Sequence, residues 1–258
     1  MFGRAAELAD VLDALRDRSL RLLTVTGRGG VGKPRLVVEV MHALDAQEGR
    51  RSVGVALAGV SSPELVLGEV AAALGVTPAG NVDAAAAIAD RMQHDDTVLV
   101  LDNFEHVVAA APAFGDLLDR CPNVQILVTS QVALRLRAER ALSLRPLPVP
   151  EPGACDLAAL TQLASVEIYC ERAAAVDRTF TLHEGNATAV AELCRRLEGL
   201  PLAIELAAAR AATLPASEIL RRYATSIDLL RRPHRVARRP PNRHRPTSCI
   251  RCCLPHRR

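Results

Sequence analysis

One glycine-rich segment near the N-terminus carries the residues best suited to chemistry. It reads Gly27-Arg28-Gly29-Gly30-Val31-Gly32-Lys33-Pro34-Arg35. Lys33 is the only lysine among 32 basic residues, and every other one is arginine. A compact ammonium can insert between phosphate oxygens, and a planar guanidinium cannot replace it there. The spacing follows the phosphate-loop pattern G-x-x-x-x-G-K-[ST], with Pro34 where a hydroxyl residue is expected. We predict that this segment binds phosphate groups.

The residues on either side of the segment have the pattern that such a loop requires. A short apolar run at 21–26 predicts a buried strand before it, and 35–46 predicts a helix after it. Glycines let successive backbone N–H groups point at an anion, and the helix adds the positive end of its dipole. A merely structural glycine-rich turn is the alternative. A lysine in register between strand and helix argues against it.

A second candidate group follows the most apolar strand of the chain, Thr97-Val-Leu-Val-Leu-Asp102. An acid at the end of a strand beside a phosphate loop holds Mg²⁺, usually through water, and we predict this role for Asp102. Its alternative is an ordinary helix-capping or loop aspartate. Asn103 can orient water but is no base, so Glu105 is the further candidate for a catalytic group.

The alternation of strands and helices predicts an α/β fold with a parallel sheet covered by helices on both faces. Its core must be built from Leu, Val, Ala and Ile, because the chain has no Trp, four Phe and two Tyr. We predict strands at 21–26, 52–57, 97–102, 124–129 and 141–145. Helices are predicted around Leu8–Leu15 and at 35–46, 63–74, 82–92, 107–120, 156–175, 186–198, 201–213 and 215–225.

These patterns divide the chain into four parts. Residues 1–146 would form a P-loop nucleotide-binding α/β domain, 147–155 a proline-rich linker, and 156–230 a helical lid-like domain. Residues 231–258 hold ten Arg and no Asp or Glu, so the rest of the chain carries −7 against +3 for the whole. This tail has no apolar periodicity, and we expect it to be disordered.

The tail leaves several interpretations open. Its arginines could bind nucleic acid non-specifically by neutralising phosphates, although no aromatic residues are interleaved for base stacking. Its cysteines and histidines could bind zinc, although a second spaced cysteine pair is missing. They are Cys249, Cys252, Cys253, His244 and His256. A frameshift in a GC-rich reading frame would also produce the abrupt change of composition near residue 231.

Composition favours a cytoplasmic protein without a membrane span. Arg4, Glu7 and Asp10 interrupt any early apolar run, so no signal peptide is expected. No uncharged stretch reaches the length that crosses a bilayer. Four cysteines lie in apolar surroundings, which is typical of buried thiols in a reducing compartment. They are Cys121, Cys155, Cys170 and Cys194.

Five motifs in a fixed order connect the chain with a known family. They are Phe2-Gly3-Arg4 with Glu7, the loop at 27–34, Val98-Leu-Val-Leu-Asp-Asn-Phe-Glu-His106, Ile126-Leu-Val-Thr-Ser130 and Gly199-Leu-Pro-Leu-Ala-Ile-Glu-Leu-Ala207. Over residues 2–210 the chain resembles the STAND-type signalling NTPases. Among these it is most similar to bacterial NB-ARC-like ATPases joined to LuxR-type or SARP-type transcriptional regulators.

The resemblance implies an AAA-like sheet, a small helical lid, and a bound ATP or ADP with Mg²⁺. It implies that Gly3 and Arg4 lie near the adenine and ribose, and that Pro201 packs near the base. Proteins of this family are switches, off with ADP and open or oligomeric with ATP, and slow hydrolysis resets them.

Three departures from the family affect the predicted activity. Pro34 lacks the hydroxyl that would ligate Mg²⁺, and it removes one backbone N–H from the loop. A proline also biases the residue before it, Lys33, away from helical backbone angles. The first turn of a helix nevertheless tolerates proline. Gln131 stands where the family has an arginine that senses the terminal phosphate, and its neutral amide makes a weaker contact. Arg135 or Arg137 could reach the site instead. Relatives continue into a winged-helix domain, so the chain would be truncated.

We therefore predict an ATP- or ADP-binding regulatory NTPase module of a signal-transduction or transcriptional-regulator protein, with impaired hydrolysis. Contacts with other domains of a longer regulator, or self-association, would transmit its state. The alternatives are an active ATPase switch that uses Asp102 and Glu105, a protein that binds nucleic acid through its tail, and a product that binds nothing.

Overall fold

The computed structural model describes residues 2–76, 83–93 and 96–223, and these separate into two compact units. One, the helical unit, comprises residues 2–5, 29–32 and 145–223. The other, the sheet unit, comprises the remaining described residues within 6–28 and 33–144. The predicted tail and the start of the predicted helix at Val82 lie outside the described residues. We keep the boundaries at 146, 155 and 230 as a proposal.

The sheet unit is built on five parallel strands in the order β2-β3-β4-β1-β5. The three inner strands and the edge strand β2 are almost fully buried, as near-continuous apolar runs require when both faces of a sheet are covered. The other edge strand, β5, is largely exposed. The strands are β1 (Leu22–Thr26), β2 (Ser52–Ala56), β3 (Val98–Asp102), β4 (Gln125–Ser130) and β5 (Glu139–Ser143). This sheet confirms the predicted fold class.

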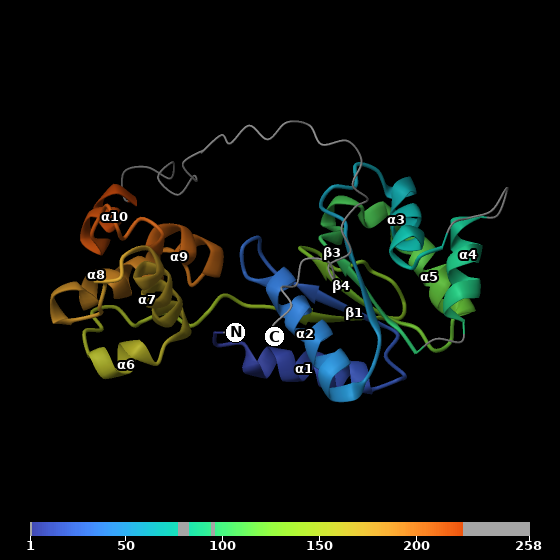
Figure 1. Ribbon diagram of the computed structural model, residues 1–258, viewed down its shortest axis with the longest axis horizontal. Coiled ribbons are helices and arrows are strands. Elements are labelled where there is room, and N and C mark those ends of the chain that lie inside the picture. The colour runs from blue at the N-terminus through green and yellow to red at the C-terminus, as the bar shows by residue number, and fades with distance from the viewer. Residues whose placement is uncertain (1, 77–82, 94–95, 224–258) are drawn as a thin grey trace. The chain divides into compact units, whose positions relative to one another are not determined.

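Helices cover the sheet as its crossover connections demand (Figure 1). Helices α3, α4 and α5 contribute to one large apolar cluster with alternate residues of the strands. Helix α2 contacts β2, β3 and β4. The helices are α1 (Ala5–Arg16), α2 (Lys33–Glu48), α3 (Val66–Ala73), α4 (Ala84–Met92) and α5 (Ala111–Arg120), with 3-10 segments η1 (Pro63–Leu65), η2 (Phe104–His106) and η3 (Val108–Ala110).

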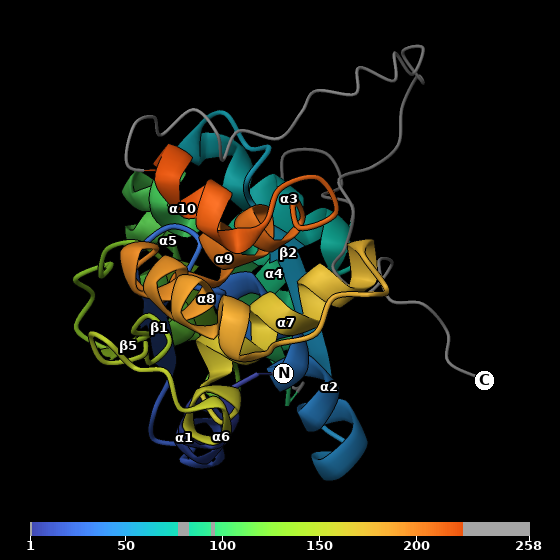
Figure 2. The same ribbon diagram turned by 90° about the vertical axis from the view of Figure 1, so that its left-hand side faces the viewer.

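The described part of the helical unit after residue 144 contains helices and no strand, as the sequence predicts. Helix α7 contacts α6, α8 and α9, and α8 contacts α10 (Figure 2). Their inward residues form a second apolar cluster that includes Tyr169, whose ring meets Phe180 edge-on. The helices are α6 (Leu157–Thr161), α7 (Ala164–Val176), α8 (Glu184–Arg196), α9 (Pro201–Ala208) and α10 (Ala216–Tyr223).

Several sequence-based boundaries were wrong. The helix predicted at 156–175 is two helices, because the chain turns between α6 and α7, and the helix predicted at 201–213 ends at Ala208. The fifth strand begins two residues earlier than predicted, because its partner residues on β1 set its position. Cys155 is exposed and Cys170 is half-buried, whereas Cys121 and Cys194 are buried as expected. Among the described residues, no helix is long and apolar enough to cross a membrane.

A buried arginine joins the amino ends of the strands. The guanidinium of Arg50 donates to the Leu15 carbonyl (2.9 Å), to Gln125 Oε1 (2.5 Å) and to Asp96 Oδ1 (3.0 Å). A buried charge is tolerated only when it is paired and hydrogen-bonded, and these three acceptors satisfy that condition. The network connects α1 with the segments that lead into β2, β3 and β4. The periodicity of the sequence does not predict this hydrogen-bond network.

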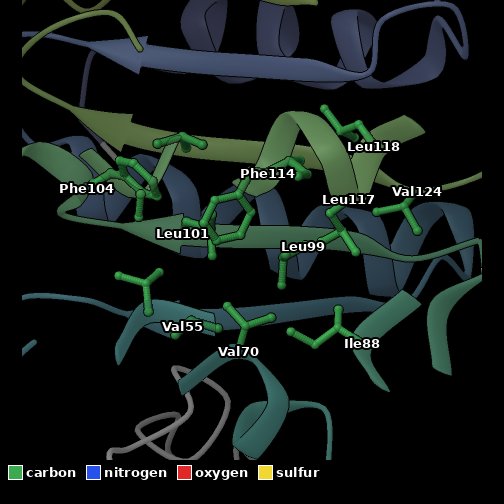
Figure 3. Packing of buried hydrophobic residues seen from close by; sticks show 14 of the residues in the cluster. Val55, Val70, Ile88, Leu99, Leu101, Phe104, Phe114, Leu117, Leu118 and Val124 are labelled. Atoms are coloured by element: carbon green, nitrogen blue, oxygen red, sulfur yellow. The ribbon is translucent and has the colours of Figure 1, made fainter. Parts of the chain in front are cut away.

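The aromatic packing in the sheet unit gives a stability prediction. Phe114 of α5 is fully buried near Leu101 and meets Phe104 edge-on, with ring centroids 5.5 Å apart (Figure 3). We expect Phe114→Ala to lower the free energy of unfolding by about 3–5 kcal/mol, because it leaves a cavity in a close-packed cluster. Urea denaturation followed by circular dichroism measures this.

The matched control is Leu65→Ala, since the Leu65 side chain is large and apolar but 53% exposed. It should change the free energy of unfolding by no more than about 0.5 kcal/mol. Equal midpoints for the two variants would contradict the packing described for Phe114.

Candidate functional site

The glycine-rich loop runs from the end of β1 to the start of α2, as predicted. Gly30 and Gly32 have φ of +79° and +99°, values that residues with a Cβ rarely adopt. A Cβ at Gly32 would meet no atom within 4 Å, so open space lies beside the backbone there. A backbone with positive φ at alternate positions beside open space suits the close approach of an anion.

Lys33 is buried and its ammonium faces its own loop. Nζ donates to the Gly27 carbonyl at 2.7 Å and to the Arg28 carbonyl at 3.4 Å. These two backbone oxygens hold the ammonium against its own loop. Phosphate oxygens would offer the same ammonium stronger, charge-assisted hydrogen bonds.

Pro34 is the second residue of α2, and Lys33 is the first. The helix therefore starts without distortion, because the first N–H groups of a helix have no partner inside it. The expected bias of Lys33 away from helical angles is not seen, since Lys33 belongs to the helix. Pro34 and Arg35 are both exposed. At position 34 the loop has neither a backbone N–H nor a hydroxyl to offer to a ligand.

Asp102 ends β3 and is buried, with its carboxylate held by a neighbouring strand. Thr129 Oγ1 of β4 donates to Asp102 Oδ1 at 2.5 Å, and the Asn103 N–H donates to Thr129 Oγ1 at 2.9 Å. Asn103 has a φ of +64°, so the chain turns sharply after the strand. Burial raises the pKa of Asp102, while the Thr129 hydrogen bond and the positive charge of Lys33 oppose the rise.

Glu105 lies in η2, just after the turn, and it contacts the residue that follows β4. Gln131 Nε2 donates to Glu105 Oε1 at 3.2 Å. The other oxygen, Oε2, is buried and has no hydrogen-bond partner among the described residues. The negative charge of Glu105 also raises the pKa of Asp102, so the two carboxylates lie close enough to interact.

The remaining predicted site residues belong to the helical unit. Arg4 is buried, and its guanidinium donates to the carbonyls of Val31 (3.2 Å) and Arg145 (2.6 Å). A Cβ at Gly3, whose φ is +55°, would lie 2.4 Å from Ala164 Cβ. Only glycine fits at that position, so Gly3 has a packing reason as well as its predicted nucleotide role.

Pro201 is the first residue of α9, where proline is favoured. The next residue, Leu202, donates its backbone N–H to the Gly30 carbonyl at 3.2 Å, and its side chain lies 3.2 Å from a Cβ built at Gly30. Gly29, Gly30, Val31 and Gly32 are grouped with the helical unit by such contacts.

Two residues that contact the site went unassigned in the sequence. In the sequence, Thr129 belongs to an apolar strand motif that gives it no separate role. Its contact with Asp102 requires β3 and β4 to be neighbouring strands. Leu202 has an apolar side chain, so its residue type could not predict that its backbone N–H donates to the loop. The assignments of nucleotide and catalytic roles to the individual residues stay predictions.

The described residues hold no cluster of three or more His, Cys, Asp or Glu that could bind a metal ion by itself. Asp102 is the one described acid that ends a strand beside the loop. Mg²⁺ is commonly held by one or two carboxylates together with phosphates of a bound substrate. The residues present fit that arrangement through Asp102, and they lack the hydroxyl that position 34 would supply.

Comparisons with known proteins agree with this geometry. Residues 16–138 match the family described as AAA domain. An uncharacterized protein of Mycobacterium tuberculosis is 36% identical over 219 residues, which is 84% of this chain and 52% of that protein. A second protein of the same organism, named "Putative HTH-type transcriptional regulator", is 35% identical over 200 residues, 77% of this chain and 21% of that protein. The chain thus spans about half the length of the first relative and about a fifth of the length of the second.

Two solved structures share the fold at low sequence identity. A Walker-type ATPase of Pyrococcus abyssi has a TM-score of 0.55 at 14% identity, over 86% of this chain and 71% of that one. Cdc6p of Pyrobaculum aerophilum has a TM-score of 0.54 at 16% identity, over 79% and 60%. A parallel sheet, a glycine loop between β1 and α2 and an acid at the end of β3 accompany these similarities. Residues 16–138 are thus similar in sequence to AAA domains, and the chain shares its fold with these two structures.

Proposed function

We propose that this chain is an ATP- or ADP-binding regulatory module whose hydrolysis is impaired. The observation that carries the proposal is the position of Lys33. It starts α2 directly after the glycine loop, is buried, and lies close enough to the strand-end Asp102 to influence its pKa. In P-loop NTPases the loop backbone and a lysine at this position bind the phosphates, and a strand-end aspartate contributes by holding Mg²⁺ beside them.

Binding would exchange hydrogen bonds within the loop for hydrogen bonds to the ligand. The Lys33 ammonium would leave the carbonyls of Gly27 and Arg28 for phosphate oxygens. The open side of Gly32 and the first turn of α2 would present N–H groups to the same phosphates. Gly3, Arg4 and Pro201 are proposed contacts of the nucleoside, on the strength of the family resemblance.

Pro34 is the reason to propose impaired hydrolysis. Mg²⁺, when bound, would neutralise charge on the transferred phosphoryl group. Asp102 would hold it through water, but Pro34 offers no oxygen for direct ligation. Gln131 brings a neutral amide where a cation would stabilise developing charge better. The nucleotide should therefore bind with little help from Mg²⁺ and turn over slowly.

An active ATPase is the second candidate, and one observation favours it. Glu105 Oε2 is buried without a hydrogen-bond partner among the described residues, so this carboxylate could accept a hydrogen bond from water. Measured turnover in the natural sequence would support this candidate. Binding of nucleic acid through the tail concerns residues 231–258, which lie outside the described part of the chain.

The biological setting is proposed from the relatives. One relative is named as a transcriptional regulator and is about five times as long as the matched segment. A nucleotide-dependent module of the STAND type, cytoplasmic and in contact with other domains or with further copies, would suit such a protein.

The lysine gives the first functional prediction. Lys33→Ala should weaken binding of a fluorescent ADP analogue about 30-fold, or about 2 kcal/mol, because a charge-assisted hydrogen bond is lost. Fluorescence anisotropy with the full chain in EDTA measures this. Arg28→Ala, in the same loop, is the control for loss of a positive charge and should have a smaller effect. Equal dissociation constants for Lys33→Ala and the natural sequence would contradict the proposed site.

The proline gives the second prediction. Pro34→Ser restores a hydroxyl and an N–H, so Mg²⁺ should then raise ATP affinity about tenfold and turnover should become measurable. Pro34→Ala restores the N–H alone and should show no comparable Mg²⁺ dependence. Titrations with ATP in Mg²⁺ and in EDTA, with phosphate release as the rate assay, compare the three chains. A strong Mg²⁺ dependence already present with Pro34 would argue for the active ATPase.

A further inference from the structure

The contact between Glu105 and Gln131 joins two neighbouring strands at the edge of the sheet where the loop begins. Gln131 follows Ser130, the last residue of β4, and Glu105 lies in η2 just after β3. The side-chain amide of Gln131 donates to Glu105 Oε1 at 3.2 Å. An amide that donates to an ionised acceptor makes a stronger hydrogen bond than one that donates to a neutral acceptor. This contact orients the Gln131 amide towards the carboxylate.

Gln131 is also adjacent in the sheet to the start of the phosphate loop. β4 pairs with β1, and Ser130 lies opposite Thr26 in their register. The next residues, Gln131 and Gly27, leave adjacent strands at the same edge, and neighbouring strands are about 4.8 Å apart. A glutamine side chain at this position can reach phosphates held by the loop. Its amide nitrogen carries two N–H groups, so while one donates to Glu105 only the other is free for a phosphate.

Glu105 opposes a third phosphate for a second reason, its charge. Its Oε2 is buried without a partner among the described residues, and its negative charge reaches Asp102 strongly enough to raise the pKa of that residue. A carboxylate in such a place repels a further negative group. ADP ends one phosphate earlier than ATP, so the penalty would fall mainly on ATP.

We propose that Glu105 is a specificity-determining residue that holds the Gln131 amide and thereby keeps the affinity for ATP no higher than the affinity for ADP. This inference rests on the proposed function, because it requires the loop to bind nucleotide. It gives Glu105 a role in binding that does not depend on hydrolysis. It gives Gln131 the role of a donor that becomes available to the terminal phosphate when Glu105 releases it.

The test is a double-mutant cycle on the full chain. ATP, its non-hydrolysable analogue and ADP compete in EDTA against the fluorescent ADP analogue, and the ratio of the ADP to the ATP dissociation constant is recorded. The variants are Glu105→Ala, Gln131→Ala and the pair together. Glu105→Gln removes the charge and keeps an acceptor. Glu151→Gln, at an exposed position in the connection before α6, is the charge-matched control.

In Glu105→Ala the ratio should rise about tenfold in favour of ATP, because the released amide gains a charged phosphate acceptor. In the Gln131→Ala background the same substitution should raise the ratio less, because only the effect of the charge is left to remove there. Glu105→Gln should give an intermediate rise. Glu151→Gln should leave the ratio unchanged. Circular dichroism confirms that each variant is folded.

An equal rise in both backgrounds would overturn the inference, because charge alone would then explain it. An unchanged ratio in Glu105→Ala would overturn it as well. Failure of the natural chain to bind either nucleotide would overturn the proposed function and this inference together, and only that result concerns both.

Discussion

The parallel register of β3, β4 and β1 is the constraint on which the rest of the site depends. Leu101 lies opposite Val128, and Ser130 lies opposite Thr26. All three strands therefore end at one edge, and the residues that follow them meet there. Asp102, Gln131 and the glycine loop come from distant parts of the sequence, and only this alignment brings them into one neighbourhood. Parallel strands need helical crossovers, so the helices that cover the sheet follow from the same arrangement.

The order of strands also sets the charge balance at that edge. Asp102 is buried, accepts a hydrogen bond from Thr129 and interacts with one cation and one further carboxylate. The cation is Lys33, whose ammonium is at present satisfied by backbone carbonyls. The buried carboxylate thus has a second carboxylate and one buried ammonium near it. Binding of a phosphate chain at this site would depend on how the Lys33 ammonium divides its hydrogen bonds between the loop carbonyls and the phosphate oxygens.

Pro34 separates two properties of a phosphate loop that usually occur together. Helix α2 begins at Lys33 and accommodates proline at its second residue without loss, because the N–H removed there would have no partner within the helix. Proline at this position is therefore compatible with the start of the helix. Position 34 itself offers a ligand neither a backbone N–H nor a hydroxyl. A stable fold with an altered site is the expected result.

The sequence by itself determined the elements and their class. Apolar runs of strand length, amphipathic stretches of helix length and the glycine pattern around Lys33 are local features, and each is decided by residues a few positions apart. Tertiary structure decided what no local pattern contains: the contact of Thr129 with Asp102, the pairing of Gln131 with Glu105, the acceptors of Arg50, and the ends of α6 and α9. Each of these depends on which strands or helices become neighbours, and a side chain gains its partner only after distant segments have packed together.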